Sequence, residues 1–112
     1  MPTLESVKQS ILTECDEDHV GLWSVIRDVE DSLPNRDEAG VRYQVLTMLH
    51  ELLVAREIEA GFPTPDGRFR SLKATPEKVM ARIEADWPVG CRPTIGDGLW
   101  FTRAKKRSRK RR

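Results

Sequence analysis

Histidine and cysteine are scarce in this sequence, with two of each, and neither recurs at the short spacings that metal-binding pairs use. There is also no Gly-x-Ser-x-Gly motif and no glycine-rich phosphate loop. Cys15 precedes His19 by four residues, but it continues the apolar register of the first predicted helix, which favours a core role over a nucleophilic one. We therefore expect no metal, cofactor, small-molecule substrate or catalytic activity.

Long apolar runs are absent as well. No segment approaches the roughly 20 apolar residues that span a bilayer. The first 20 residues contain Glu5, Lys8, Glu14 and Asp16 and lack the apolar centre of a signal peptide. These features predict a cytoplasmic protein with reduced thiols and without membrane contact.

Charge is distributed unevenly, although the formal net charge is only +1. Residues 103–112 carry eight of the 19 basic residues and no acid, which leaves 11 basic and 18 acidic residues, a net charge of −7, in residues 1–102. We expect residues 1–102 to form one globular domain and residues 103–112 to be a disordered basic tail. The basic residues of the tail are Arg103, Lys105, Lys106, Arg107, Arg109, Lys110, Arg111 and Arg112.

Apolar residues recur at three- and four-residue spacing in four segments, each of which is predicted to be a helix. Asn35 as N-cap and Glu38 as its capping-box partner should begin the third and most central helix, and Thr75 followed by Pro76 should begin the fourth. The predicted helices cover about 3–15, 20–33, 35–56 and 75–87.

Strand patterns follow the third helix. Residues 57–62 alternate polar and apolar, residues 63–67 are typical of a turn, and residues 68–72 return, which predicts a β-hairpin. Residues 99–102 could form a last short strand. The tripeptide Gly-Leu-Trp occurs at 21–23 and at 98–100, but no repeat surrounds it, so we interpret it as a coincidence and place both tryptophans in the core. The predicted fold class is α+β, with a compact helical core, a hairpin, a C-terminal helix and a short strand.

The order of two helices, a long leucine-rich helix and a hairpin resembles the winged-helix class over about residues 20–74. The segment that carries this resemblance is Leu46-Thr-Met-Leu-His-Glu-Leu-Leu-Val-Ala-Arg-Glu-Ile-Glu-Ala-Gly61. The resemblance implies a binding domain, and many such domains read DNA with the third helix. The acids over 35–57 outnumber the arginines, which instead favours the winged helices that contact proteins.

Two functions follow as hypotheses. In the first, the protein is a regulatory domain whose basic tail contacts nucleic acid through phosphates, without base stacking because the tail has no aromatic residue. In the second, an acidic face binds a protein partner, as in immunity or antitoxin-like proteins. A further alternative is that the acidic patch, residues 16–18 with 28, 30 and 31, holds the chain's own tail. The candidate partner-binding residues are Asp28, Glu30, Asp31, Trp100 and Phe101.

Overall fold

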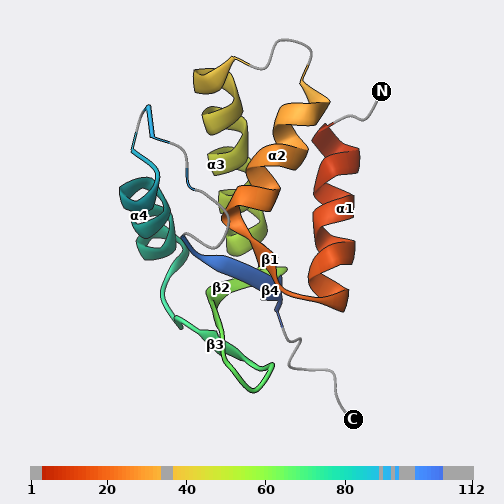
Figure 1. Cartoon of the computed structure of the whole chain (residues 1–112), viewed down its shortest axis with the longest axis vertical. Coiled ribbons are helices and arrows are strands. Elements are labelled where there is room, and N and C mark those ends of the chain that lie inside the picture. The colour runs from red at the N-terminus through yellow and green to blue at the C-terminus, as the bar shows by residue number, and fades with distance from the viewer. Residues whose placement is uncertain (1–3, 34–36, 89, 92, 94–97, 105–112) are drawn as a thin grey trace.

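Four helices and a four-stranded antiparallel sheet make up the described part of the chain, which confirms the predicted α+β class. The computed structural model describes residues 4–33, 37–88, 90, 91, 93 and 98–104. The elements, in chain order, are α1 (Leu4–Glu17), β1 (Val20–Gly21), α2 (Leu22–Ser32), α3 (Glu38–Val54), β2 (Ile58–Pro63), β3 (Phe69–Ser71), α4 (Pro76–Asp86) and β4 (Trp100–Arg103) (Figure 1).

The last strand occupies an interior position in the sheet. The strand order is β1-β4-β2-β3, so β4 pairs with β1 on one side and with β2 on the other. The predicted hairpin is formed by β2 and β3, and the predicted strand at 99–102 is β4, displaced by one residue toward the C-terminus. The helices α1, α2 and α3 pack in sequence, with α4 against α3 (Figure 1).

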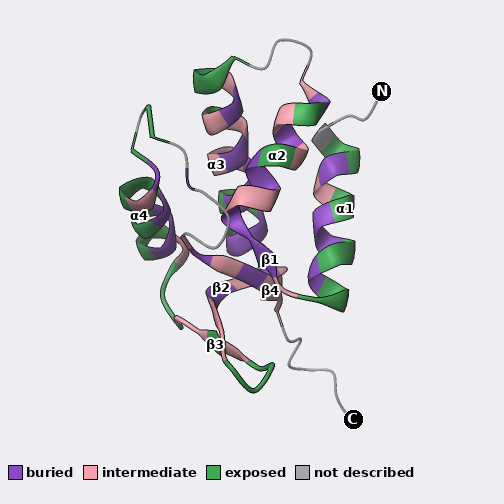
Figure 2. Cartoon of the chain, in the orientation of Figure 1, coloured by how far each residue is buried: buried purple, intermediate pink, exposed green. Residues whose placement is uncertain are grey.

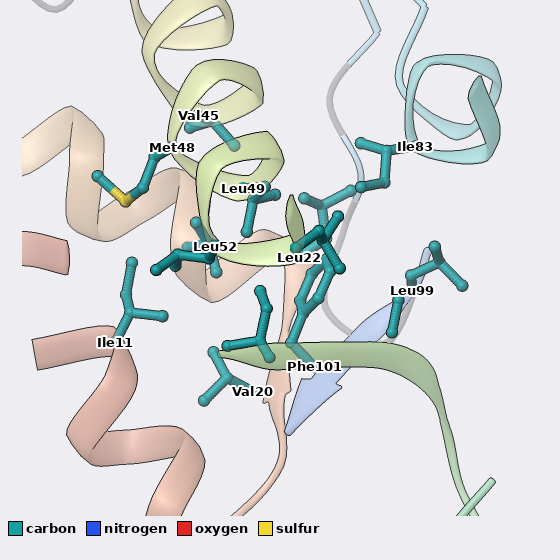
Figure 3. Packing of buried hydrophobic residues seen from close by; sticks show 14 of the residues in the cluster. Ile11, Val20, Leu22, Val45, Met48, Leu49, Leu52, Ile83, Leu99 and Phe101 are labelled. Carbon is teal, nitrogen blue, oxygen red and sulfur yellow. The ribbon is translucent and has the colours of Figure 1, made fainter. Parts of the chain in front are cut away.

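The core lies between the helices and one face of the sheet. Buried side chains occupy the facing sides of the helices, whereas the outer faces of α1 and α4 and the hairpin loop are exposed (Figure 2). Phe101 of β4 is fully buried among apolar side chains of the cluster that includes Leu22, Leu49 and Leu99 (Figure 3). Because successive strand residues face opposite sides of a sheet, the burial of Phe101 places its neighbour Trp100 on the outer face.

The second helix begins later than predicted. Val20 and Gly21 form β1, paired with Phe101 and Trp100, so α2 starts at Leu22 rather than at residue 20. A two-residue strand has no periodicity that a sequence pattern could reveal.

The third helix also begins later than predicted. Its N-cap is Asp37, whose carboxylate accepts a hydrogen bond of 3.0 Å from the Gly40 amide. The predicted capping box is wrong, because Glu38 is the first helical residue, and Asn35 lies outside the described residues. In the fourth helix, the predicted cap is confirmed, since the Thr75 side chain accepts from the Lys78 amide.

Replacement of Phe101 by alanine should cost about 3–5 kcal/mol of unfolding free energy, because it removes a fully buried ring from the centre of the core. The matched control is Tyr43→Ala, since Tyr43 on α3 is 66% exposed and should contribute within about 0.5 kcal/mol. Urea unfolding of both variants would measure the difference. Equal losses in the two variants would contradict the core position of Phe101.

Candidate functional site

The two Gly-Leu-Trp segments lie against each other in the fold. The Leu22 amide donates a hydrogen bond of 3.0 Å to the Leu99 carbonyl, and Gly21 pairs with Trp100 across β1 and β4. Both leucines are fully buried, whereas Trp23 and Trp100 are only partly buried. The core placement expected for the two tryptophans is therefore wrong in part, and the duplicated tripeptide was the sequence feature that could have indicated their meeting.

The two tryptophan rings form a corner. Their centroids are 4.6 Å apart and their planes are inclined at 84°, which is an edge-to-face contact. Glycine at position 21 makes room for it, because a Cβ there would overlap the ring of Trp23. Trp100 also has glycine as its partner in β2, so no cross-strand side chain stands on either side of its ring.

This corner is one side of a hollow of about 280 Å³. The hollow is bordered by the end of α1, the turn into β1, the start of α2, and β4. Its described lining includes three acids and no lysine or arginine. The residues are Glu14, Glu17, Asp18, His19, Val20, Gly21, Trp23, Ser24 and Trp100.

The carboxylates around the hollow carry an excess of negative charge. The pKa of Glu14 is raised, first by burial and then by the charges of Asp28 and Glu17. The pKa of Asp28 is raised mainly by burial and further by Asp31, while Arg27 lowers it. Like charges are thus held close together at neutral pH, which a cation could relieve.

Arg103, expected in the tail, belongs to β4 and faces acids instead. Its guanidinium lies 3.2 Å from Asp16 and 3.5 Å from Glu57. The charge of Arg103 is therefore already paired with carboxylates and is not available to a phosphate. The folded domain extends at least to Ala104, whose amide donates a hydrogen bond to the Glu57 carbonyl. The other seven predicted nucleic-acid contacts, Lys105, Lys106, Arg107, Arg109, Lys110, Arg111 and Arg112, lie outside the described residues.

The five predicted partner-binding residues are only partly brought together. Trp100 lines the hollow, and Asp28 is close enough to raise the pKa of Glu14. Glu30 and Asp31 lie on α2 but do not line the hollow. The prediction that Phe101 contacts a partner is wrong, because its side chain is fully buried in the core. The sequence pattern missed Glu14 and Trp23.

Cys15, four residues before His19, was the candidate nucleophile in the sequence. Cys15 is buried, and burial, with a smaller contribution from Glu14, raises the pKa of its thiol to about 12, so it is not a thiolate at neutral pH. Among the described residues, no group of three or more histidine, cysteine, aspartate or glutamate side chains could hold a metal ion. No helix in the same set of residues is long and apolar enough to cross a membrane.

Comparison with known proteins gives no relative for this site: no family model matches the chain, and no curated protein or solved structure matches it significantly.

Replacement of Glu14 by glutamine should stabilise the fold at pH 7. The gain should be less than about 1 kcal/mol, because Glu14 is only slightly shielded from solvent, which screens its charge. A carboxyl whose pKa is raised on folding costs stability when ionised, so the gain should fade as the pH falls toward about 4, where glutamates protonate in both states. Urea unfolding at several pH values measures this. Glu84→Gln on the exposed face of α4 is the control, and an equal gain there would contradict the charge crowding around Glu14.

Proposed function

We propose that this chain is a non-catalytic binding domain whose acidic hollow takes basic side chains of a protein partner. The observation that carries the proposal is the presence, in one hollow, of two tryptophan rings at 84° and the carboxylates of Glu14, Glu17 and Asp18. Aromatic faces attract cations through the ring quadrupole, and carboxylates form charge-assisted hydrogen bonds with guanidinium and ammonium groups.

The magnitudes favour a segment with several basic residues over a single cation. A cation on an exposed tryptophan face contributes about 0.5–1 kcal/mol, and an exposed ion pair contributes a similar amount or less. One lysine or arginine would therefore bind only weakly. Several of them in a row could engage the rings and the carboxylates together.

The net charge of residues 1–102 supports the same kind of partner. Residues 1–102 carry a net charge of −7, which attracts basic surfaces at a distance and speeds their encounter. An immunity or antitoxin-like protein is expected to act in this way, by blocking a basic partner with an acidic face. The partner is identified here only by its chemistry, a protein segment rich in lysine and arginine.

The test is titration with a peptide of four Arg-Gly repeats, followed by tryptophan fluorescence. A neutral-tail variant, with glutamine at Lys105, Lys106, Arg107, Arg109, Lys110, Arg111 and Arg112, prevents the tail from repelling the peptide. In this background, Trp23→Leu should weaken binding about three- to tenfold, because one wall of the corner is lost. Binding should also weaken from about 50 to 200 mM salt.

Tyr43→Leu is the matched control, since it removes an exposed aromatic ring from α3, which does not line the hollow. Its affinity should equal that of the neutral-tail background. Circular dichroism checks that each variant is folded. Absence of peptide binding, or equal weakening by the two substitutions, would overturn the proposal.

A second candidate function is nucleic-acid binding through the basic tail. Seven cations follow Ala104, and the order α1, β1, α2, α3, β2, β3 is compatible with the winged-helix resemblance. The exposed side of α3 offers Tyr43, His50 and Val54, which carry no fixed positive charge. Arg42 is engaged by the Trp87 carbonyl, at 3.0 and 3.2 Å. In this function the tail, rather than α3, supplies the attraction to phosphate.

Duplex DNA and RNA, titrated at about 50 and 200 mM salt, test the second candidate. With seven phosphates neutralised, the logarithm of affinity should fall against the logarithm of salt with a slope of roughly −5 to −6. The neutral-tail variant should lose this binding. Retention of sequence-specific binding by that variant would show that α3 reads DNA and that the tail does not dominate.

A further inference from the structure

One strand carries a wall of the hollow and leads, through Ala104, to the basic tail. Trp100 is the first residue of β4 and Arg103 the last, so their Cα atoms are separated by about 10 Å of extended chain. Ala104, which follows β4, is therefore only four residues along the chain from a wall of the hollow.

The cation that directly precedes the tail, Arg103, is bound to the acidic end of α1. Arg103 contacts Asp16, and Asp16 directly precedes Glu17 and Asp18, which line the hollow. The next basic residues in the chain are Lys105, Lys106 and Arg107. The opposite charges of the tail and the hollow, and the short length of chain between them, both favour contact.

We propose that the basic residues after Ala104 dock in the hollow of the same molecule and compete there with the basic protein partner. The inference rests on the proposed function, because it requires that the hollow takes cations. It also names the ligand that occupies the hollow when no partner is bound. That ligand is a segment of this chain, and a basic partner displaces it.

The chain is long enough for this contact. Residues 105–112 can span up to about 26–29 Å, well beyond the separation of Arg103 and Trp100. A segment tethered by a short flexible linker acts at an effective concentration on the order of 1 mM. If its intrinsic dissociation constant were about 0.1 mM, it would weaken the apparent affinity of a competing peptide about tenfold.

Docking of the tail would link the two candidate functions. A lysine or arginine that pairs with Glu17 cannot at the same time neutralise a phosphate. Occupation of the hollow by a basic partner therefore frees the tail for nucleic acid, and nucleic acid on the tail opens the hollow. Thermodynamic linkage requires the two effects to be equal in size.

A spin label on the tail tests the proposal in the full-length chain. Cys91→Ser removes the exposed thiol, Cys15 is buried, and Ser108→Cys then supplies a single reactive site for a nitroxide. Docking should broaden the indole N–H signals of Trp23 and Trp100 more than that of Trp87, which is buried beside Arg42 on α3. In the neutral-tail background, and in about 0.5 M salt, the same label should broaden the Trp23 and Trp100 signals markedly less, because only the tether then keeps it near them.

The outcomes separate this inference from the proposed function. If the Arg-Gly peptide binds the neutral-tail variant but the label broadens Trp23 and Trp100 no more in the natural tail than in the neutral tail, docking of the tail is wrong and the proposed function stands. If neither effect is seen, both are wrong. Broadening of isotope-labelled chains by a separate spin-labelled chain would place the tail in the hollow of a second copy and would overturn docking within one molecule.

Docking also predicts a change in nucleic-acid affinity that net charge does not explain. Trp23→Leu keeps the charge of the chain but removes a ring that holds the tail, so DNA should bind about threefold more tightly at 50 mM salt. Tyr43→Leu, which also leaves the charge unchanged, should leave DNA affinity as it is. Equal DNA affinities for both variants and the natural chain would contradict a docked tail.

Discussion

The crossing of the two Gly-Leu-Trp segments is the contact on which the arrangement of this protein depends. The first turn of a helix leaves amide groups without helical partners, and at the start of α2 the N-cap Gly21 has no side chain to supply one. The Leu99 carbonyl accepts from the Leu22 amide instead. One crossing therefore fixes the edge of the sheet and the start of α2. It also places the two leucines in the core with the two tryptophans outside it.

Local features of the sequence were sufficient for most of the elements. Helical spacing, the Thr75 cap and the turn before β3 each depend on neighbouring residues, and those elements lie where the sequence predicts them, with ends that differ by at most three residues. The hollow depends on contacts between residues nearly 80 positions apart. Whether Trp100 or Phe101 faces the core is set by the pairing register of β4, and a shift of one residue would exchange them. No local pattern contains that information.

The acids around the hollow illustrate how a binding surface can oppose stability. The charges of Asp28 and Glu17 oppose ionisation of Glu14 in the folded chain, so a neutral side chain at position 14 should favour folding. Binding surfaces often retain such charges because a ligand of opposite charge compensates them. Arg103 provides such compensation within the folded domain, since its guanidinium pairs with both Asp16 on α1 and Glu57 before β2.

The interior position of β4 has a consequence for folding during synthesis. The ribosome makes the chain from its N-terminus, so β1 and β2 exist before the strand that must lie between them. Until β4 emerges, both expose unpaired backbone groups, and the core lacks Leu99 and Phe101. The nascent chain therefore has an incomplete sheet until β4 is made. It is vulnerable in that interval to pairing with other chains, and chaperones that cover strand edges would matter most then.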